Sequence, residues 1–127
     1  MVRGIEHVGL SAQNPKRLVD WYVSVLGFKV VHAIEERKTY FVRDESGGML
    51  EIYPSNVEVA PVDNFHSGYR HLAITVVGFE EEVARLWGRG VSLLEEGIVT
   101  TQGIKLAFFH DPEGNLLHLV ERRQPLP

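Results

Sequence analysis

Two stretches of the chain match each other without a gap: YFVRDESGGMLEIY at residues 40–53 and AFFHDPEGNLLHLV at residues 107–120. In both, apolar and polar residues alternate on either side of an acidic turn that contains glycine, a pattern typical of two strands joined by a short turn. The match places Glu51 opposite His118. The sequence therefore predicts the same strand–turn–strand unit twice.

The match extends to the segments that lie upstream. HVGLSAQ at residues 7–13 aligns with HLAITVV at residues 71–77, which pairs His7 with His71. Each segment alternates like a strand and is followed by an apolar stripe at helical spacing, then by further strand patterns. This order predicts an α+β protein made of two βαβββ modules. We expect the modules to lie in a pseudo-twofold arrangement and to form a cleft between curved mixed sheets.

The predicted organisation is a single domain over residues 1–127. Residues 5–53 form the first module and residues 68–123 the second. Residues 54–67 lose the periodicity and contain two prolines, so we interpret them as a connector. Within the second module, VSLLEEG at residues 91–97 is predicted to be the strand that follows the helix.

Composition restricts the classes of partner. The formal net charge is −4 and no long basic run occurs, which argues against nucleic acid. No apolar stretch approaches the roughly 20 residues of a membrane span, and the first residues lack the apolar core of a signal peptide. We therefore expect a cytoplasmic protein without a membrane partner. The chain has no cysteine, which excludes disulfides and thiolate metal ligands.

Four potential metal ligands occupy equivalent places in the two modules. His7 and His71 lie on the first strand of each module, and Glu51 and His118 lie on the last. Alternation places all of them on the polar faces of their strands, so with helices on the apolar faces they point toward a common centre. Imidazole and carboxylate together suit divalent iron, nickel, manganese or zinc, and can leave a coordination position open for substrate.

The sequence resembles the vicinal oxygen chelate superfamily, which includes glyoxalase I, extradiol dioxygenases and bleomycin resistance proteins. The resemblance runs from IEHVGLSAQNPKRLVDWYVSVLGFKVV through GMLEIYP and YRHLAITV to FHDPEGNLLHLVE. It implies paired βαβββ modules with the metal in the cleft between them. In metal-binding members the fourth ligand is usually glutamate, whereas this chain has histidine there. The positions that match the family's ligands are His7, Glu51, His71 and His118.

The resemblance implies a metal-dependent enzyme, a lyase, isomerase or dioxygenase, that chelates a small oxygen-rich substrate. Glu51 and His118 are the expected catalytic residues, because either can transfer a proton as well as bind the metal. Glu121 is close to His118 in sequence, but alternation places it on the opposite face. The alternative function is a non-catalytic protein that sequesters a small ligand, as bleomycin resistance proteins do. A small-molecule substrate and a second copy of the chain, in a homodimer, are the expected partners.

Overall fold

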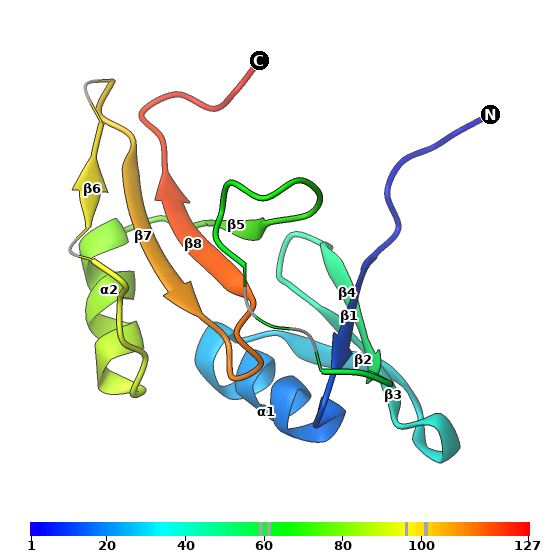
Figure 1. The fold of residues 1–127 in the computed structure, drawn as a ribbon. Helices are drawn as coiled ribbons and strands as arrows, with labels where there is room; N and C mark the ends of the chain where they lie inside the picture. The colour runs from blue at the N-terminus through cyan, green and yellow to red at the C-terminus, as the bar shows by residue number, and fades with distance from the viewer. Residues whose placement is uncertain (59, 61, 96, 101) are drawn as a thin grey trace. The chain divides into compact units, whose positions relative to one another are not determined.

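The computed structural model describes residues 1–58, 60, 62–95, 97–100 and 102–127. The chain divides into two units, Met1–Ala60 and Pro61–Pro127 (Figure 1). Their boundary lies within residues 54–67, the segment in which the periodicity of the sequence is lost. Each unit consists of one sheet and one helix of at least ten residues.

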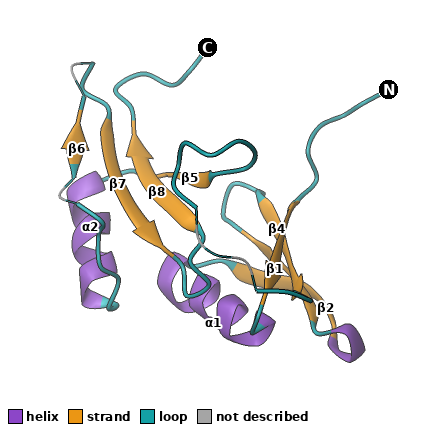
Figure 2. Ribbon diagram, in the orientation of Figure 1, coloured by secondary structure: helices purple, strands orange, loops and turns teal. Residues whose placement is uncertain are grey.

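The first unit is a four-stranded mixed sheet with a helix packed on one face (Figure 2). Its strands lie in the order β1-β4-β3-β2, with β1 parallel to β4 and the other neighbours antiparallel. In chain order its elements are β1 (Val8–Ala12), α1 (Pro15–Leu26), β2 (Lys29–Ile34), the 3₁₀ helix η1 (Glu35–Arg37), β3 (Thr39–Arg43) and β4 (Met49–Pro54).

The second unit repeats this topology. Its strands lie in the order β5-β8-β7-β6, with β5 parallel to β8 and the other neighbours antiparallel. The prediction of two βαβββ modules with mixed sheets is therefore confirmed. In chain order its elements are β5 (His71–Thr75), α2 (Phe79–Gly88), β6 (Ile98–Val99), β7 (Lys105–His110) and β8 (Leu116–Glu121).

Helix α1 has residues at both ends that favour the start and the end of a helix. The Asn14 side chain accepts a hydrogen bond from the amide of Arg17 at 3.1 Å, and Pro15 takes the first helical position, where its missing N–H is not needed. At the other end Gly27 adopts a left-handed conformation with φ of 77°, and its amide donates to the carbonyl of Val23. A side-chain cap thus satisfies the first turn of α1, and a glycine ends the helix.

The apolar stripe of α1 forms the core of the first unit with one face of its sheet. Burial of these side chains is the main stabilising contribution, at about 25 cal/mol per Å² of apolar surface. The buried residues of this core include Leu18, Val19, Tyr22 and Val25 of α1 and Tyr40, Val42, Leu50 and Ile52 of the sheet.

Among the residues that the structure describes, no helix has the length and apolar character that crossing a bilayer requires.

In the second unit, Glu121 stabilises the start of α2. The residue before this helix is Gly78, which has no side chain to cap it. Glu121 Oε1 instead accepts hydrogen bonds from the amides of Gly78 at 2.8 Å and Phe79 at 3.2 Å. A carboxylate at a helix N-terminus is also favoured by the helix dipole. Glu121 therefore lies on the helix side of the sheet, as alternation predicts.

The two matching acidic turns share one hydrogen-bond pattern. Asp44 Oδ1 accepts from the amide of Gly48 at 2.8 Å, and Asp111 Oδ1 accepts from the amide of Asn115 at 3.0 Å. Each aspartate thus satisfies the backbone of the residue four positions later, which closes the turn. Asp111 is only 4% exposed, so this pairing also satisfies a buried carboxylate. The internal repeat therefore includes the turns as well as the strands.

The strand predicted over residues 91–97 is wrong. None of residues 91–95 is a strand, and residue 96 lies outside the described residues; the strand at this edge is β6, at Ile98–Val99. The reason lies at the end of α2, because the amide of Val91 donates to the carbonyl of Leu86 at 2.9 Å and closes the last helical turn. The first residue of this short apolar run therefore ends the helix and does not begin a strand.

Candidate metal site

The first unit brings together two of the four predicted ligands. His7 lies just before β1, and Glu51 lies in β4 opposite Gly9. Because His7 and Gly9 are two residues apart, they share the face on which Glu51 lies, opposite α1. His7 Nε2 is 3.5 Å from Glu51 Oε2, and the two side chains are 32% and 27% exposed. The pair is therefore half-buried and accessible to a small ligand.

The spacing of this pair matches that of two ligands on one ion. At 3.5 Å, His7 Nε2 and Glu51 Oε2 are too far apart for a good hydrogen bond. Two donor atoms that each lie about 2.1 Å from a metal, at a tetrahedral angle, are about 3.4 Å apart. The two atoms thus face each other at a distance that an ion between them would require.

The second unit brings together the other two predicted ligands. His71 begins β5, and His118 lies on β8 opposite Ala73. The centroids of the two imidazole rings are 4.9 Å apart. His118 is buried, with 7% of its surface exposed, whereas His71 is exposed. The small residues Gly9 and Ala73 thus lie at equivalent positions beside Glu51 and His118.

In all three histidines the Nδ1 atom is close to an oxygen acceptor. His7 Nδ1 lies 2.9 Å from Glu6 Oε1, and His71 Nδ1 lies 2.7 Å from Asn64 Oδ1. His118 Nδ1 lies 3.2 Å from the carbonyl oxygen of Leu119. These oxygens accept hydrogen bonds, so each Nδ1 donates its proton and the lone pair of the neutral ring is on Nε2.

Such an arrangement is typical of metal-ligating histidines. A histidine that binds a metal through one ring nitrogen usually donates the other N–H to a carboxylate, carbonyl or amide oxygen, which fixes the ring orientation. The acceptors here include one of each kind. The chemistry of the donor set, three Nε2 atoms and one carboxylate, therefore fits a divalent first-row metal.

Burial lowers the pKa of His118 below its ordinary value of 6.5, and the proximity of His71 lowers it further. The hydrogen bond to the Leu119 carbonyl raises the pKa, and its effect is smaller than that of burial but larger than that of His71. A neutral imidazole is the form that binds metal, because the protonated ring has no lone pair. His118 is therefore in the ligating state at neutral pH.

Two phenylalanines outside the predicted set pack beside the candidate ligands. Phe41 lies opposite Glu51 and meets the His7 ring edge-on, with centroids 5.6 Å apart. Phe108 lies opposite His118, with ring centroids 4.7 Å apart. The match between residues 40–53 and 107–120 pairs these two phenylalanines, so the signal was present in the repeat. Their rings pack against the imidazoles of the candidate histidines.

The sequence analysis also missed Glu6 and Asn64, the acceptors of two histidine Nδ1 protons. Glu6 directly precedes its histidine, whereas Asn64 is seven residues away in the connector. Among the described residues, no group of three or more histidine, aspartate or glutamate side chains is close enough to hold an ion. The four candidates occur as one pair in each unit, and their convergence on one ion stays a prediction.

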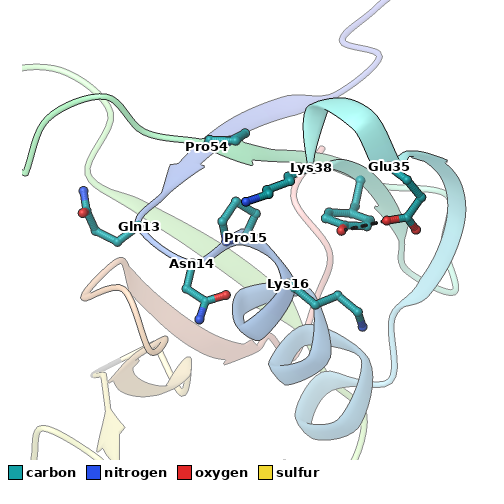
Figure 3. A pocket seen from close by; sticks show the side chains of 8 residues that line it. Gln13, Asn14, Pro15, Lys16, Glu35, Lys38 and Pro54 are labelled. Carbon is teal, nitrogen blue, oxygen red and sulfur yellow. Dashed lines mark hydrogen bonds between the residues drawn. The ribbon is translucent and has the colours of Figure 1, made fainter.

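A cavity of about 530 Å³ in the first unit is separate from these residues (Figure 3). It lies at the helix side of the sheet, where α1 begins and β4 ends. The Tyr40 hydroxyl donates to Glu35 at 3.3 Å, and Lys16 pairs with Asp20, so these polar groups are already satisfied. The lining residues include none of the four candidate ligands: Gln13, Asn14, Pro15, Lys16, Glu35, Lys38, Tyr40 and Pro54.

Comparison with known proteins agrees with this fold. The pattern of the Glyoxalase/Bleomycin resistance protein/Dioxygenase superfamily matches residues 4–119. A glyoxalase family protein from Enterococcus faecalis is 31% identical, with a TM-score of 0.73 over 94% of this chain and 98% of that one. A glyoxalase/dioxygenase from Nostoc punctiforme is 16% identical, with a TM-score of 0.77 over 96% and 92% of the two chains. Lactoylglutathione lyase from Agrobacterium tumefaciens is 17% identical, with a TM-score of 0.73 over 94% of each chain. No curated protein sequence matches the chain.

Proposed function

This chain belongs to the Glyoxalase/Bleomycin resistance protein/Dioxygenase superfamily, and we propose that within it the protein is a metal-dependent enzyme acting on a small oxygen-rich substrate. Two side chains from each module would hold one divalent ion. The ion would be iron, nickel, manganese or zinc. The proposed ligands are His7, Glu51, His71 and His118.

The observation that carries this proposal is the common orientation of the three imidazoles. Each histidine donates its Nδ1 proton to a different kind of oxygen, so that Nε2 is the atom left to bind. This pairing orients each ring so that Nε2 is the atom available to an ion. The 3.5 Å separation between His7 Nε2 and Glu51 Oε2 adds a ligand-like spacing.

The residues of the site define what it could do chemically. When bound, a divalent ion supplies Lewis acidity that polarises substrate oxygens. Glu51 is the only carboxylate in the proposed set, and it is 27% exposed, so it can accept a proton from a substrate and return it. His118 is neutral and buried, and so can serve as ligand or base. Phe41 and Phe108 place an apolar ring beside each pair.

Replacing the family's usual glutamate by His118 changes the charge of the donor set. Three neutral imidazoles and one carboxylate carry a single negative charge, so a divalent ion keeps a net charge of +1. That charge favours an anionic substrate group, such as an enolate or a carboxylate, on the open positions. We propose the reaction class only as lyase, isomerase or dioxygenase, because each of these would use the Lewis acidity that a bound ion would supply.

The test is equilibrium dialysis of the untagged, chelator-treated protein against zinc, nickel, manganese and iron(II). The proposal predicts one tightly bound ion per chain for at least one of these metals. His7→Ala and His71→Ala should each lose it, whereas His110→Ala, which removes an exposed histidine, should keep it. If no metal binds, the alternative function, non-catalytic sequestration of a small ligand, would replace the enzyme proposal.

We also propose the small-molecule substrate, the homodimer and the cytoplasmic location that the sequence analysis predicts. Sedimentation equilibrium of the purified protein tests the dimer. A mass of about twice 14.4 kDa is expected, and a monomer at all concentrations would contradict it.

A further inference from the structure

We propose that Asn64 is a positioning residue, which fixes the tautomer and orientation of His71 so that Nε2 is its metal-binding atom. This inference rests on the proposed function. It extends that function to a residue of the connector, outside both strands that carry the ligands of the second unit. It also predicts that changes in the loop before β5 alter metal affinity although the loop provides no ligand.

The contact between the two side chains is short. His71 Nδ1 lies 2.7 Å from Asn64 Oδ1, at the short end of the range for an N–H···O hydrogen bond. His71 is exposed, so strand packing alone does not hold its ring. The ring contacts that the structure provides are tilted or edge-on, to His118 and to Phe108 at 6.3 Å between centroids. The amide oxygen is thus the group that fixes the rotation of the His71 ring.

The chain before β5 is folded so that Asn64 reaches His71. Asp63 Oδ1 accepts hydrogen bonds from the amide of Phe65 and from His66 Nδ1, each at 2.9 Å. The Phe65 amide is the main cause that lowers the pKa of Asp63, with the His66 hydrogen bond next. Asp63 therefore closes a turn around Asn64 as a charged acceptor. This turn fixes the backbone from which the Asn64 side chain extends.

An amide oxygen has a specific consequence for the imidazole. Which nitrogen of a neutral histidine carries the proton is set by the hydrogen bond that the ring makes. A net hydrogen-bond contribution of about 1 kcal/mol favours one tautomer roughly fivefold. Asn64 therefore selects the Nδ1–H tautomer of His71, in which the lone pair is on Nε2, with an acceptor that carries no charge. His7 differs in this respect, because its acceptor is the carboxylate of Glu6.

Two substitutions separate the acceptor from the shape of the side chain. Asn64→Leu keeps a similar volume and removes the acceptor oxygen, whereas Asn64→Asp keeps an oxygen at the same place. Asn56→Leu is the matched control, because Asn56 is an exposed asparagine of the same connector. Asn64 lies in a loop outside the apolar core, so we expect all three variants to fold, and circular dichroism checks this before any other measurement.

The first readout is the His71 tautomer in the metal-free, ¹⁵N-labelled protein, from long-range ¹H–¹⁵N correlation spectra of the imidazoles. The wild type should show a protonated Nδ1 and an unprotonated Nε2. Asn64→Leu should shift His71 toward a mixture of tautomers, and Asn64→Asp should restore Nδ1–H. A wild-type His71 protonated on Nε2, or a spectrum unchanged in Asn64→Leu, would overturn the inference.

The second readout is zinc affinity, from competition with a chromogenic chelator. We expect Asn64→Leu to weaken binding by 10- to 100-fold, the usual effect of removing a hydrogen-bond partner from a metal-ligating histidine. Asn64→Asp and Asn56→Leu should stay within a few-fold of the wild type. Equal affinity of Asn64→Leu and wild type would refute the positioning role while leaving the metal site intact. Absence of zinc and other metals from the wild type would refute the proposed function, and the tautomer spectra would still decide whether Asn64 orients the ring.

Discussion

Replacing His118 by leucine in the metal-free protein should leave the fold intact and make it slightly more stable, although it removes a proposed ligand. His118 is 7% exposed and lies between the rings of His71 and Phe108. Burial lowers its pKa because the protonated ring loses hydration there. Folding thus removes a polar ring from water, and a leucine of similar volume has no polar atom to desolvate.

The magnitude follows from two opposing contributions. The variant loses the hydrogen bond from His118 Nδ1 to the Leu119 carbonyl, a net loss of about 0.5–1.5 kcal/mol. It gains the burial of a leucine side chain, which contributes about 1.5–3 kcal/mol relative to exposure. The free energy of unfolding at pH 7 should therefore rise by about 1 kcal/mol.

The gain should grow as the pH falls, and the sign follows from proton binding. Below pH 6.5 the unfolded wild type takes up a proton at residue 118, whereas the folded protein keeps this ring neutral until the pH passes its lowered pKa. The unfolded state then binds more protons, so the wild type loses stability in that window. The leucine variant binds no proton at this position, so the difference widens from pH 7 downward and levels off below the pKa of the folded state.

The assay is urea unfolding followed by circular dichroism, at pH 7 and pH 5.5, with a chelator present. His110→Leu is the control, because an exposed histidine should show no widening difference. A loss of more than about 1.5 kcal/mol in His118→Leu at pH 7, beyond the net worth of one hydrogen bond, would refute this reasoning. A difference that stays constant as the pH falls would refute the assignment of His118 as a buried neutral ring.

Three further predictions separate the metal site from the fold. Glu121→Gln should lower the free energy of unfolding by about 1 kcal/mol, because the start of α2 loses a charged cap, while metal affinity stays unchanged; urea unfolding and dialysis measure the two effects. Phe109→Ala removes a fully buried ring and should destabilise the protein by about 3–5 kcal/mol, whereas Phe108→Ala should mainly weaken metal binding. Equal unfolding midpoints for the two variants would contradict the assignment of Phe109 to the core face of the sheet and Phe108 to the face of the proposed ligands. Addition of metal to 100 times its dissociation constant should stabilise the wild type by about 2.7 kcal/mol and leave His7→Ala unaffected, as thermal unfolding with and without chelator would show.

Much of the fold could be predicted because the chain repeats one pattern. Alternation of apolar and polar residues predicts the strands, and apolar stripes at helical spacing predict the helices. The gap-free matches predict that the same order of elements occurs twice. The exception, at residues 91–97, arose because a short apolar run has no periodicity that distinguishes a strand from the end of a helix. Only hydrogen bonds, such as that from Val91 to Leu86, distinguish the two.

The strand faces of the four candidate ligands could also be predicted, because strand alternation assigns each side chain to a face. The residues that orient them could not. Asn64 reaches His71 through a turn whose shape depends on Asp63, and Glu6 acts through a side chain at the end of a strand. Such contacts depend on backbone conformation in loops and at strand ends, for which sequence periodicity carries no information.

The most direct test of the proposed function is X-ray absorption spectroscopy of the zinc- or nickel-loaded protein, which counts the imidazoles around the ion. If both modules contribute ligands to one site, we predict three imidazoles per ion. The number should fall to two in His71→Ala if that variant retains any metal. An ion with a single imidazole would mean that the His7–Glu51 pair binds metal alone, and an ion with two imidazoles and no carboxylate would mean the same for the His71–His118 pair. Either result would contradict a site shared between the two modules.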